Sequence, residues 1–308
     1  MPATPRLALA GKQVIPALGY GVGTAWFGSA ASEREEALIA SVRAALDAGF
    51  RHIDEAEMYQ NESATGTAIR QWLDEHSDVV RDDLFVTSKA MSVDAEGGID
   101  AICRRSLKAM GLSYFDLYLI HAPFQRDGTP FKTPLPALWA QMESLVDTGL
   151  ARHVGVSNWR AQDLDQVYQP ARIKPCCNQV EGHPYLQQQA LMDYCAARGI
   201  LVTNYGPLTP LTKAPLRGGP VDAPVEAAAR AHHMTPGQVL LRWALQTGRG
   251  VITTSSKPER LTEILRVPEF DLTTEEIASI SSAGDKAPFR SFWTNTAGAF
   301  CEDPRLEQ

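Results

Sequence analysis

Four ionisable side chains of this chain could act together as a proton donor: Asp54, Tyr59, Lys89 and His121. A tyrosine with a pKa of about 10 is a weak acid at neutral pH, but a neighbouring lysine ammonium lowers that pKa. An aspartate beside the lysine would keep it charged and in place, and a histidine could hydrogen-bond a substrate oxygen. This combination is suited to protonating a carbonyl oxygen, provided that the fold brings the four side chains together.

Each of these residues alone also has a simpler structural interpretation. Asp54 and Lys89 could form an ion pair that only stabilises the fold, Tyr59 could pack on a loop, and His121 could be a hydrogen-bonded core residue. However, Asp54, Lys89 and His121 each follow a short apolar run, and Tyr59 lies five residues after Asp54. Three successive strand ends with the same kind of chemistry favour a site over three separate structural roles.

Strand-like and helix-like segments alternate along nearly the whole chain. Eight short apolar runs are typical of buried strands: residues 18–21, 50–53, 84–88, 115–120, 153–156, 176–180, 200–204 and 250–253. Amphipathic helical patterns lie between them: among them 33–48, 99–110, 136–147, 187–198 and a helix from Thr235 through Gln246 that opens with a capping box.

This alternation implies a parallel sheet, and eight such units in 308 residues predict one (β/α)8 TIM barrel as a single domain over residues 1–308. Two further runs, 6–9 and 13–17, flank Ala10-Gly11-Lys12 and predict a short N-terminal β-hairpin. A doubly wound dinucleotide fold is disfavoured, because Gly19-Tyr-Gly21-Val-Gly23 lacks the spacing of its glycine fingerprint.

Composition and charge narrow the class of protein further. The net charge of −7 and the pI of about 5.5 argue against nucleic-acid or anionic-membrane partners. The five cysteines form no Cys-x-x-Cys pair, so we expect buried free thiols in a reducing compartment. We read no secretory signal and no membrane span. We therefore expect a cytoplasmic protein, more often monomeric than oligomeric, that acts on a small molecule.

In a TIM barrel the chemistry lies at the carboxyl ends of the strands. Every predicted strand ends in a polar residue: Thr24, Asp54, Lys89, His121, Ser157 with Asn158, Gln179, Tyr205, and Ser255 with Ser256. We expect this ring to face one bowl at that end of the barrel. His52, two residues before Asp54, is expected to face the helices, and no cluster of residues is placed to bind a metal.

These motifs resemble those of the aldo-keto reductases, from Gly19 to about Phe292. The matching segments keep their order and spacing: Gly-Val-Gly-Thr (21–24), Gly-Phe-Arg-His-Ile-Asp-Glu-Ala-Glu-Met-Tyr-Gln-Asn-Glu (49–62), Thr-Ser-Lys (87–89), Leu-Tyr-Leu-Ile-His-Ala-Pro (117–123), Val-Gly-Val-Ser-Asn-Trp (154–159), Asn-Gln-Val-Glu-Gly-His-Pro-Tyr-Leu-Gln (178–187), Tyr-Gly-Pro-Leu (205–208) and Thr-Ser-Ser-Lys-Pro-Glu-Arg-Leu-Thr-Glu (254–263). The closing segment 284–292 is most similar to fungal conjugated polyketone and ketopantoyl lactone reductases.

The resemblance implies NADPH-dependent reduction of a ketone or aldehyde by direct hydride transfer. Tyr59 would be the general acid, tuned by Lys89 and Asp54, and His121 would orient the carbonyl. The implied cofactor contacts are as follows: Gly23, Thr24 and Ala25 near the nicotinamide ribose, with Asp54 close by; Ser157, Asn158 and Gln179 at the carboxamide; Tyr205 on the nicotinamide ring; Leu208 at the pyrophosphate; Ser255, Ser256, Lys257 and Arg260 at the 2′-phosphate; and Glu263 at the adenine.

The chain departs from the family pattern in its cofactor and substrate segments. Many members have Pro-Lys at Thr253-Thr254, and Lys257 beside Arg260 could replace that lysine at the 2′-phosphate. If Lys257 is only solvated, the preference for NADPH is weaker. Many members also have Trp where this chain has Ala122. An open pocket is then expected beside Tyr59 and His121, lined by Trp26, Ala122, Phe124 and Trp159, and bulky, dicarbonyl or ketolactone substrates become plausible.

Two other functions remain open from the sequence. The chain could be a cofactor-binding regulatory module with little turnover, or a metal-dependent barrel hydrolase. Glu55 and Glu57 also have no clear role, because relatives often carry small or neutral residues there. They are either solvated or add negative potential that resists formation of a Tyr59 phenolate.

Overall fold

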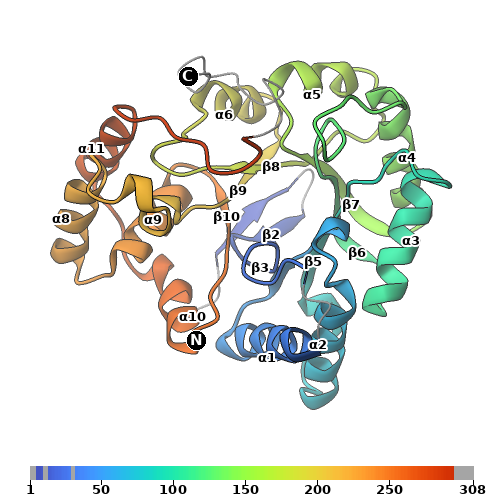
Figure 1. Ribbon diagram of the computed structural model, residues 1–308, viewed down its shortest axis with the longest axis horizontal. Helices are drawn as coiled ribbons and strands as arrows, with labels where there is room; N and C mark the ends of the chain where they lie inside the picture. Colours follow the sequence, from blue (N-terminus) through green and yellow to red (C-terminus); the bar gives the residue numbers. More distant parts are fainter. Residues whose placement is uncertain (1–4, 10–12, 29–31, 295–308) are drawn as a thin grey trace.

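The computed structural model describes residues 5–9, 13–28 and 32–294, and within them eight parallel strands close into a barrel. The order around the barrel is β10-β3-β4-β5-β6-β7-β8-β9, so neighbours in the chain are neighbours in the sheet except at the closure. Helices surround the barrel (Figure 1). The predicted (β/α)8 barrel is confirmed.

Each apolar run that predicted a strand overlaps one. The barrel strands are β3 (Leu18–Gly21), β4 (His52–Asp54), β5 (Phe85–Ala90), β6 (Phe115–Ile120), β7 (Ala151–Ser157), β8 (Cys177–Glu181), β9 (Leu201–Tyr205) and β10 (Gly250–Thr253). All six residues of β6 are buried, because one face of a barrel strand meets the barrel interior and the other meets the helices. This double burial explains why the strands read as continuous apolar runs.

The five helices whose bounds the sequence predicted begin and end close to those positions: they are α1 (Ser32–Ala48), α3 (Gly98–Met110), α4 (Leu135–Asp147), α6 (Gln189–Ala196) and α9 (Pro236–Gln246). The other described helices are α2 (Glu62–Glu75), α5 (Ala161–Tyr168), α7 (Thr209–Thr212), α8 (Asp222–His232), α10 (Pro258–Leu265) and α11 (Thr274–Gly284). The capping box of α9 is present: Gln238 N donates to Thr235 Oγ1 at 3.3 Å, and Thr235 N donates to Gln238 Oε1 at 3.0 Å. No described helix is long and apolar enough to cross a membrane.

The N-terminal hairpin closes the amino-terminal end of the barrel. Its strands β1 (Arg6–Ala8) and β2 (Val14–Pro16) pair antiparallel, as predicted, whereas the turn at 10–12 lies outside the described residues. Leu9 and Ile15 pack against Leu117, Leu119 and other side chains of the barrel interior. Cys103, Cys176, Cys177 and Cys195 are buried free thiols, and Cys301 lies outside the described residues.

Five segments at the carboxyl ends of the strands surround the candidate site. They are the 3-10 turn η1 (Glu57–Tyr59), the loop 121–134 after β6, the segment 206–221 after β9, the loop 254–257 before α10, and the segment 285–294 after α11. Four of these segments follow a barrel strand, which determines where they begin, whereas segment 285–294 follows α11.

Gly66 allows α2 to lie against the last turn of α3. A Cβ built at this position would fall on the backbone atoms of Met110, well inside van der Waals contact. Backbone atoms of a buried helix end cannot move aside as a flexible side chain can, so the glycine is required by packing.

We expect Gly66→Ala to lower the free energy of unfolding by about 1–3 kcal/mol through overpacking. Gly237→Ala is the matched control, because it also lies in a helix but a Cβ added there would meet its nearest neighbour only at 3.9 Å. That substitution should be neutral or stabilising by up to about 1 kcal/mol. Denaturant titration of both variants checks the prediction, and equal stabilities would contradict it.

Candidate active site

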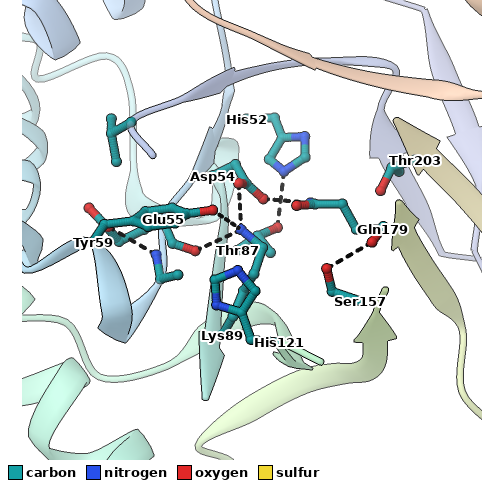
Figure 2. A network of polar contacts seen from close by, with 12 residues as sticks. His52, Asp54, Glu55, Tyr59, Thr87, Lys89, His121, Ser157, Gln179 and Thr203 are labelled. Carbon is teal, nitrogen blue, oxygen red and sulfur yellow. Dashed lines mark hydrogen bonds and ion pairs between the residues drawn. The ribbon is translucent and has the colours of Figure 1, made fainter. Parts of the chain in front are cut away.

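The site is organised around the buried ammonium group of Lys89. Lys89 lies in β5, and its Nζ donates to Asp54 Oδ1 at 2.6 Å, to the backbone oxygen of Glu55 at 3.1 Å and to Tyr59 Oη at 3.2 Å (Figure 2). The side chain is fully buried, and so are these partners apart from the ring of Tyr59. Two neighbouring strands and the loop after β4 therefore bring three of the four predicted residues together.

A tight loop aims Tyr59 at Lys89. Tyr59 ends η1, and Gln60 behind it takes a left-handed conformation with φ of 58°. Glu57 Oε2 accepts backbone N–H groups of Met91 at 2.9 Å and Ser92 at 3.1 Å, which ties η1 to the end of β5. Asn61 Nδ2 donates to the backbone oxygens of Val22 and Trp26. Glu57 thus anchors the loop, a role that the sequence did not reveal.

The protonation states suit a proton donor. Burial raises the pKa of Tyr59 to about 12, although Lys89 acts in the opposite direction. Burial alone would lower the pKa of Lys89, but Asp54 and Tyr59 raise it, and the net direction is upward. The sequence predicted a lowered tyrosine pKa because it considered only the lysine. In the structure burial outweighs that effect, so Tyr59 carries its proton and Lys89 its charge at neutral pH.

His121 stands edge-on to the tyrosine ring, with ring centroids 5.6 Å apart and an interplanar angle of 82°. Burial and the charge of Lys89 hold the pKa of His121 well below its ordinary value, so the imidazole is neutral. Its Nδ1 is buried with no hydrogen-bond partner in the part of the chain that the structure describes. A neutral ring next to Tyr59 on the wall of a cavity fits an oxygen-orienting role.

Gln179 belongs to the Lys89 network. Its Nε2 donates to Asp54 Oδ2 at 2.7 Å, so both carboxylate oxygens of Asp54 have a partner. Ser157 Oγ donates to the backbone oxygen of Gln179 at 2.7 Å, and Asn158 Nδ2 donates to the backbone oxygen of His121 at 2.9 Å. Tyr205 Oη donates to Asn158 Oδ1 at 2.7 Å. These four side chains lie together as expected. Their hydrogen-bond partners in this structure are one another, Asp54 and the backbone of His121.

His52 contradicts its sequence interpretation. Its ring contacts Phe85 of the barrel interior, and its Nε2 lies 3.0 Å from Thr87 Oγ1. Residues two apart on a strand share a face, so His52 points inward beneath Asp54 and does not face the helices. Burial lowers the pKa of His52 to about 4, and the ring is neutral.

A cavity of about 790 Å³ opens above this network. It extends from Phe27, Met58 and Tyr59 on one side to Thr253, Thr254 and the 206–213 segment on the other. Predicted site residues on its wall are Gly23, Thr24, Asp54, Tyr59, His121, Asn158, Gln179, Tyr205 and Leu208. The structure therefore brings together most of the strand-end residues around one space.

The expected substrate wall differs from the observed one. Trp159 is buried in the core, and Trp26 packs on the core with its Nε1 directed to Tyr20 Oη at 3.4 Å. Ala122 and Phe124 are buried in a small cluster against which Trp293 packs. None of the four lines the cavity. Trp293 contacts both His121 and Phe124, so it fills the space expected beside Ala122.

The residues that take their place come mostly from loops. The cavity wall includes Phe27, Met58, Arg126, Phe292 and Trp293, none of which the sequence singled out. The segment that carries Phe292 and Trp293 is held by buried Glu181. The oxygens of Glu181 accept His183 Nε2 at 3.0 Å and the backbone N–H groups of Ser291 at 2.8 Å and Phe292 at 3.0 Å. The Glu-Gly-His sequence in the 178–187 motif was the available indication of this anchor.

The candidate 2′-phosphate residues lie next to the cavity end at Thr254. Ser255 and Ser256 belong to the loop before α10, Lys257 caps that helix, and Arg260 and Glu263 lie within it. Lys257 and Arg260 are exposed and form no ion pair with the rest of the described chain. Ala25 is also exposed, next to Thr24 in the loop after β3. None of these except Thr24 lines the cavity, so their cofactor roles stay predictions.

The Aldo/keto reductase family matches residues 18–285 of the chain. The chain belongs to this family. A Schizosaccharomyces pombe NAD/NADP-dependent indole-3-acetaldehyde reductase is 39% identical over 90% of this chain and 95% of its own length. An aldo-keto reductase of Mycolicibacterium vanbaalenii is 39% identical over 94% and 95%. The crystal structure of a Bombyx mori aldo-keto reductase in complex with NADP is 32% identical, with a TM-score of 0.82, covering 91% and 92%.

Within the described residues, no three His, Cys, Asp or Glu side chains lie close enough together to hold a metal ion. The metal-dependent hydrolase alternative would need such a group of metal ligands, and the described residues contain none. The resemblance to fungal ketopantoyl lactone reductases in particular stays a prediction.

Glu55 follows β4 directly, next to Asp54 in the chain, and its carboxyl is buried on the outer side of the barrel. It is fully buried, its Oε1 accepts Ala56 N at 2.9 Å, and its Oε2 has no partner among the described residues. Burial raises the pKa of Glu55 to about 8, and Glu62 adds to this. The side chain is thus neutral at pH 7. Neither alternative that the sequence left open holds for Glu55, because it is not solvated and adds no negative charge at that pH.

This buried carboxyl should make the stability of the protein fall with rising pH. An acid whose pKa is about 8 when folded and 4.5 when unfolded keeps its proton longer in the folded state, so the free energy of unfolding decreases between these pH values. Each pKa unit corresponds to about 1.4 kcal/mol. Glu55→Gln stays neutral, so its advantage over the unmodified protein should grow by about 2–4 kcal/mol between pH ~5 and pH ~8.

Denaturant titration at both pH values measures this difference. Glu36→Gln on α1 is the control, because it removes an exposed carboxylate. A Glu55→Gln advantage that does not change with pH would show that Glu55 is not protonated in the folded protein.

Proposed function

We propose that this aldo/keto reductase reduces a ketone or aldehyde to an alcohol with NADPH, using Tyr59 as the general acid. The observation that carries the proposal is the Lys89 Nζ to Tyr59 Oη contact of 3.2 Å at the wall of a large cavity, with Asp54 fixing the lysine at 2.6 Å. A carbonyl oxygen bound in the cavity beside Tyr59 would meet a protonated phenol backed by a cation.

The residues around the cavity fit a nicotinamide dinucleotide. Amide and hydroxyl groups of Ser157, Asn158 and Gln179 lie at the end near Tyr59, where they suit a carboxamide, and Tyr205 offers an aromatic face there. A carboxamide that bound to Asn158 Oδ1 would replace the hydrogen bond that Asn158 accepts from Tyr205. At the other end, Lys257 and Arg260, which pair with no described carboxylate, suit a phosphate. The names of the relatives support this choice, because one is NAD/NADP-dependent and one was solved with NADP.

The chain's own residues then manage the proton. When bound, the reduced nicotinamide supplies the hydride. Tyr59 gives its proton to the carbonyl oxygen, and the charge that develops on its own oxygen faces the Lys89 ammonium, which lowers the cost of losing the proton. Asp54 keeps that ammonium charged and immobile. His121 is neutral, so it can share a hydrogen bond with the substrate oxygen without adding a competing charge.

Removing the phenolic hydroxyl tests the acid assignment. We expect Tyr59→Phe to lower kcat by about 10²–10⁴-fold, the usual contribution of a positioned acid, with cofactor affinity changed by less than about threefold. Tyr168→Phe, on α5 and bonded to the backbone oxygen of Arg198, is the control for loss of a tyrosine hydroxyl. Unchanged turnover by Tyr59→Phe would refute the assignment. Tight cofactor binding by the unmodified protein without turnover of any carbonyl would support the regulatory-module alternative.

The choice between NADPH and NADH is tested at Arg260. We expect Arg260→Ala to raise the KM for NADPH by about tenfold, which is about 1.4 kcal/mol, and to leave the KM for NADH nearly unchanged. Arg266→Ala is the control, because this residue at the end of the same helix pairs with Glu269 at 2.9 Å. Equal effects of Arg260→Ala on both cofactors would contradict a contact with the 2′-phosphate.

A further inference from the structure

The loop after β6 presents one arginine at the substrate end of the cavity. Arg126 is exposed and lines the cavity, and its Cζ lies 5.8 Å from the centroid of the Phe27 ring. The Phe27 ring in turn lies 6.1 Å from that of Tyr59. Arg126 therefore stands one aromatic ring away from the proposed proton donor.

The loop holds this arginine in a defined position. Gln125 N donates to Thr129 O at 2.8 Å, Gly128 N donates to Gln125 O at 2.8 Å, and Phe124 and Pro130 form an antiparallel bridge. Arg126 thus occupies a central position of a tight turn. At the base of the loop, Asp94 accepts the backbone N–H groups of Lys132 at 2.7 Å and Thr133 at 3.0 Å. A pre-formed loop loses little entropy when its side chain binds a ligand.

The adjacent carboxylate of Asp127 is bonded within its own loop. Asp127 Oδ1 accepts Thr129 N at 3.0 Å and Thr129 Oγ1 at 2.7 Å. Arg126 has no ion pair or hydrogen bond with any described residue. Its contact with Phe27 is a cation–π contact, with Cζ 5.8 Å from the ring centroid, and none of its N–H groups has a hydrogen-bond partner among the described residues.

The charged residues of the cavity wall also indicate that Arg126 is available to an anion. Within the described chain its charged residues are Asp54, Arg126 and Lys213, and Asp54 is already paired with Lys89. Lys213 lies over Phe292 in the segment that also contributes Leu208, the residue predicted at the cofactor pyrophosphate. Among these wall residues, Arg126 is thus the free cation at the substrate end, in a protein whose net charge is −7.

We propose that Arg126 selects carbonyl substrates that carry a carboxylate or similar anionic group, held from the carbonyl by a spacer of about one aromatic ring. The anion accepts hydrogen bonds from the guanidinium fork, while the carbonyl oxygen reaches Tyr59. This inference rests on the proposed carbonyl reductase function and adds a substrate class to it.

A matched pair of substrates tests the proposal. 4-Carboxybenzaldehyde and methyl 4-formylbenzoate have the same ring and spacing but differ in charge. We expect Arg126→Gln to lower kcat/KM for the anionic aldehyde about five- to tenfold, mainly through KM, and to change it less than about twofold for the ester. Comparing each variant with the unmodified enzyme cancels the different intrinsic reactivity of the two aldehydes.

Lys132→Gln is the control, because it removes one positive charge from the same loop but does not line the cavity. An equal loss of anionic-substrate turnover in that variant would overturn the proposal in favour of a general surface potential. The proposal would also be overturned if Arg126→Gln left the ratio of kcat/KM for the anionic aldehyde to kcat/KM for the ester unchanged.

A binding measurement separates this inference from the reductase function. Terephthalate, titrated against the NADP-loaded protein by tryptophan fluorescence, should bind about five- to tenfold more weakly to Arg126→Gln than to the unmodified protein. This outcome supports the anion site even if neither aldehyde is reduced, in which case the reductase proposal alone fails. Equal terephthalate affinity in both proteins would refute the role of Arg126.

Discussion

The buried ammonium of Lys89 is the constraint on which the site depends. An unpaired charge in a protein interior costs several kcal/mol, so the chain must surround this group with acceptors. Asp54, the backbone oxygen of Glu55 and Tyr59 Oη supply them. Gln179 completes the second oxygen of Asp54 from across the barrel. Strands β4, β5 and β8 are thereby joined in the interior by polar contacts that have to form together.

Strand alternation decides the fate of two adjacent carboxyls. Asp54 points into the barrel and meets a cation, whereas Glu55 points outward toward α2, where Glu62 raises its pKa further. The first forms an ion pair and the second keeps its proton. A charged Glu55 would oppose loss of the proton from Tyr59, because its negative charge raises the pKa of that tyrosine. The two environments therefore separate two carboxyls that follow one another in the chain.

The sequence predicted those features that depend on local periodicity. The eight strands, the hairpin and the ring of polar strand ends follow from apolar runs and from the rule that parallel strands expose their carboxyl ends together. The direction of the Tyr59 pKa could not be predicted, because it depends on burial by residues from several loops. The cavity wall was also missed: Phe27, Met58 and Arg126 lie in loops, where no repeating pattern reports which side chains point inward.

The site also shows how a distant segment can replace a local side chain. The resemblance places a tryptophan after the histidine of β6 in many relatives, and this chain has Ala122, from which an open pocket was expected. Trp293 instead packs on the cluster of Met91, Ala122 and Phe124, and its ring lies 5.9 Å from that of His121. Glu181 fixes the backbone just before it. The side-chain volume that is missing at Ala122 is thus supplied by a segment more than a hundred residues later in the chain. The position of that segment depends on the buried carboxylate of Glu181 in β8.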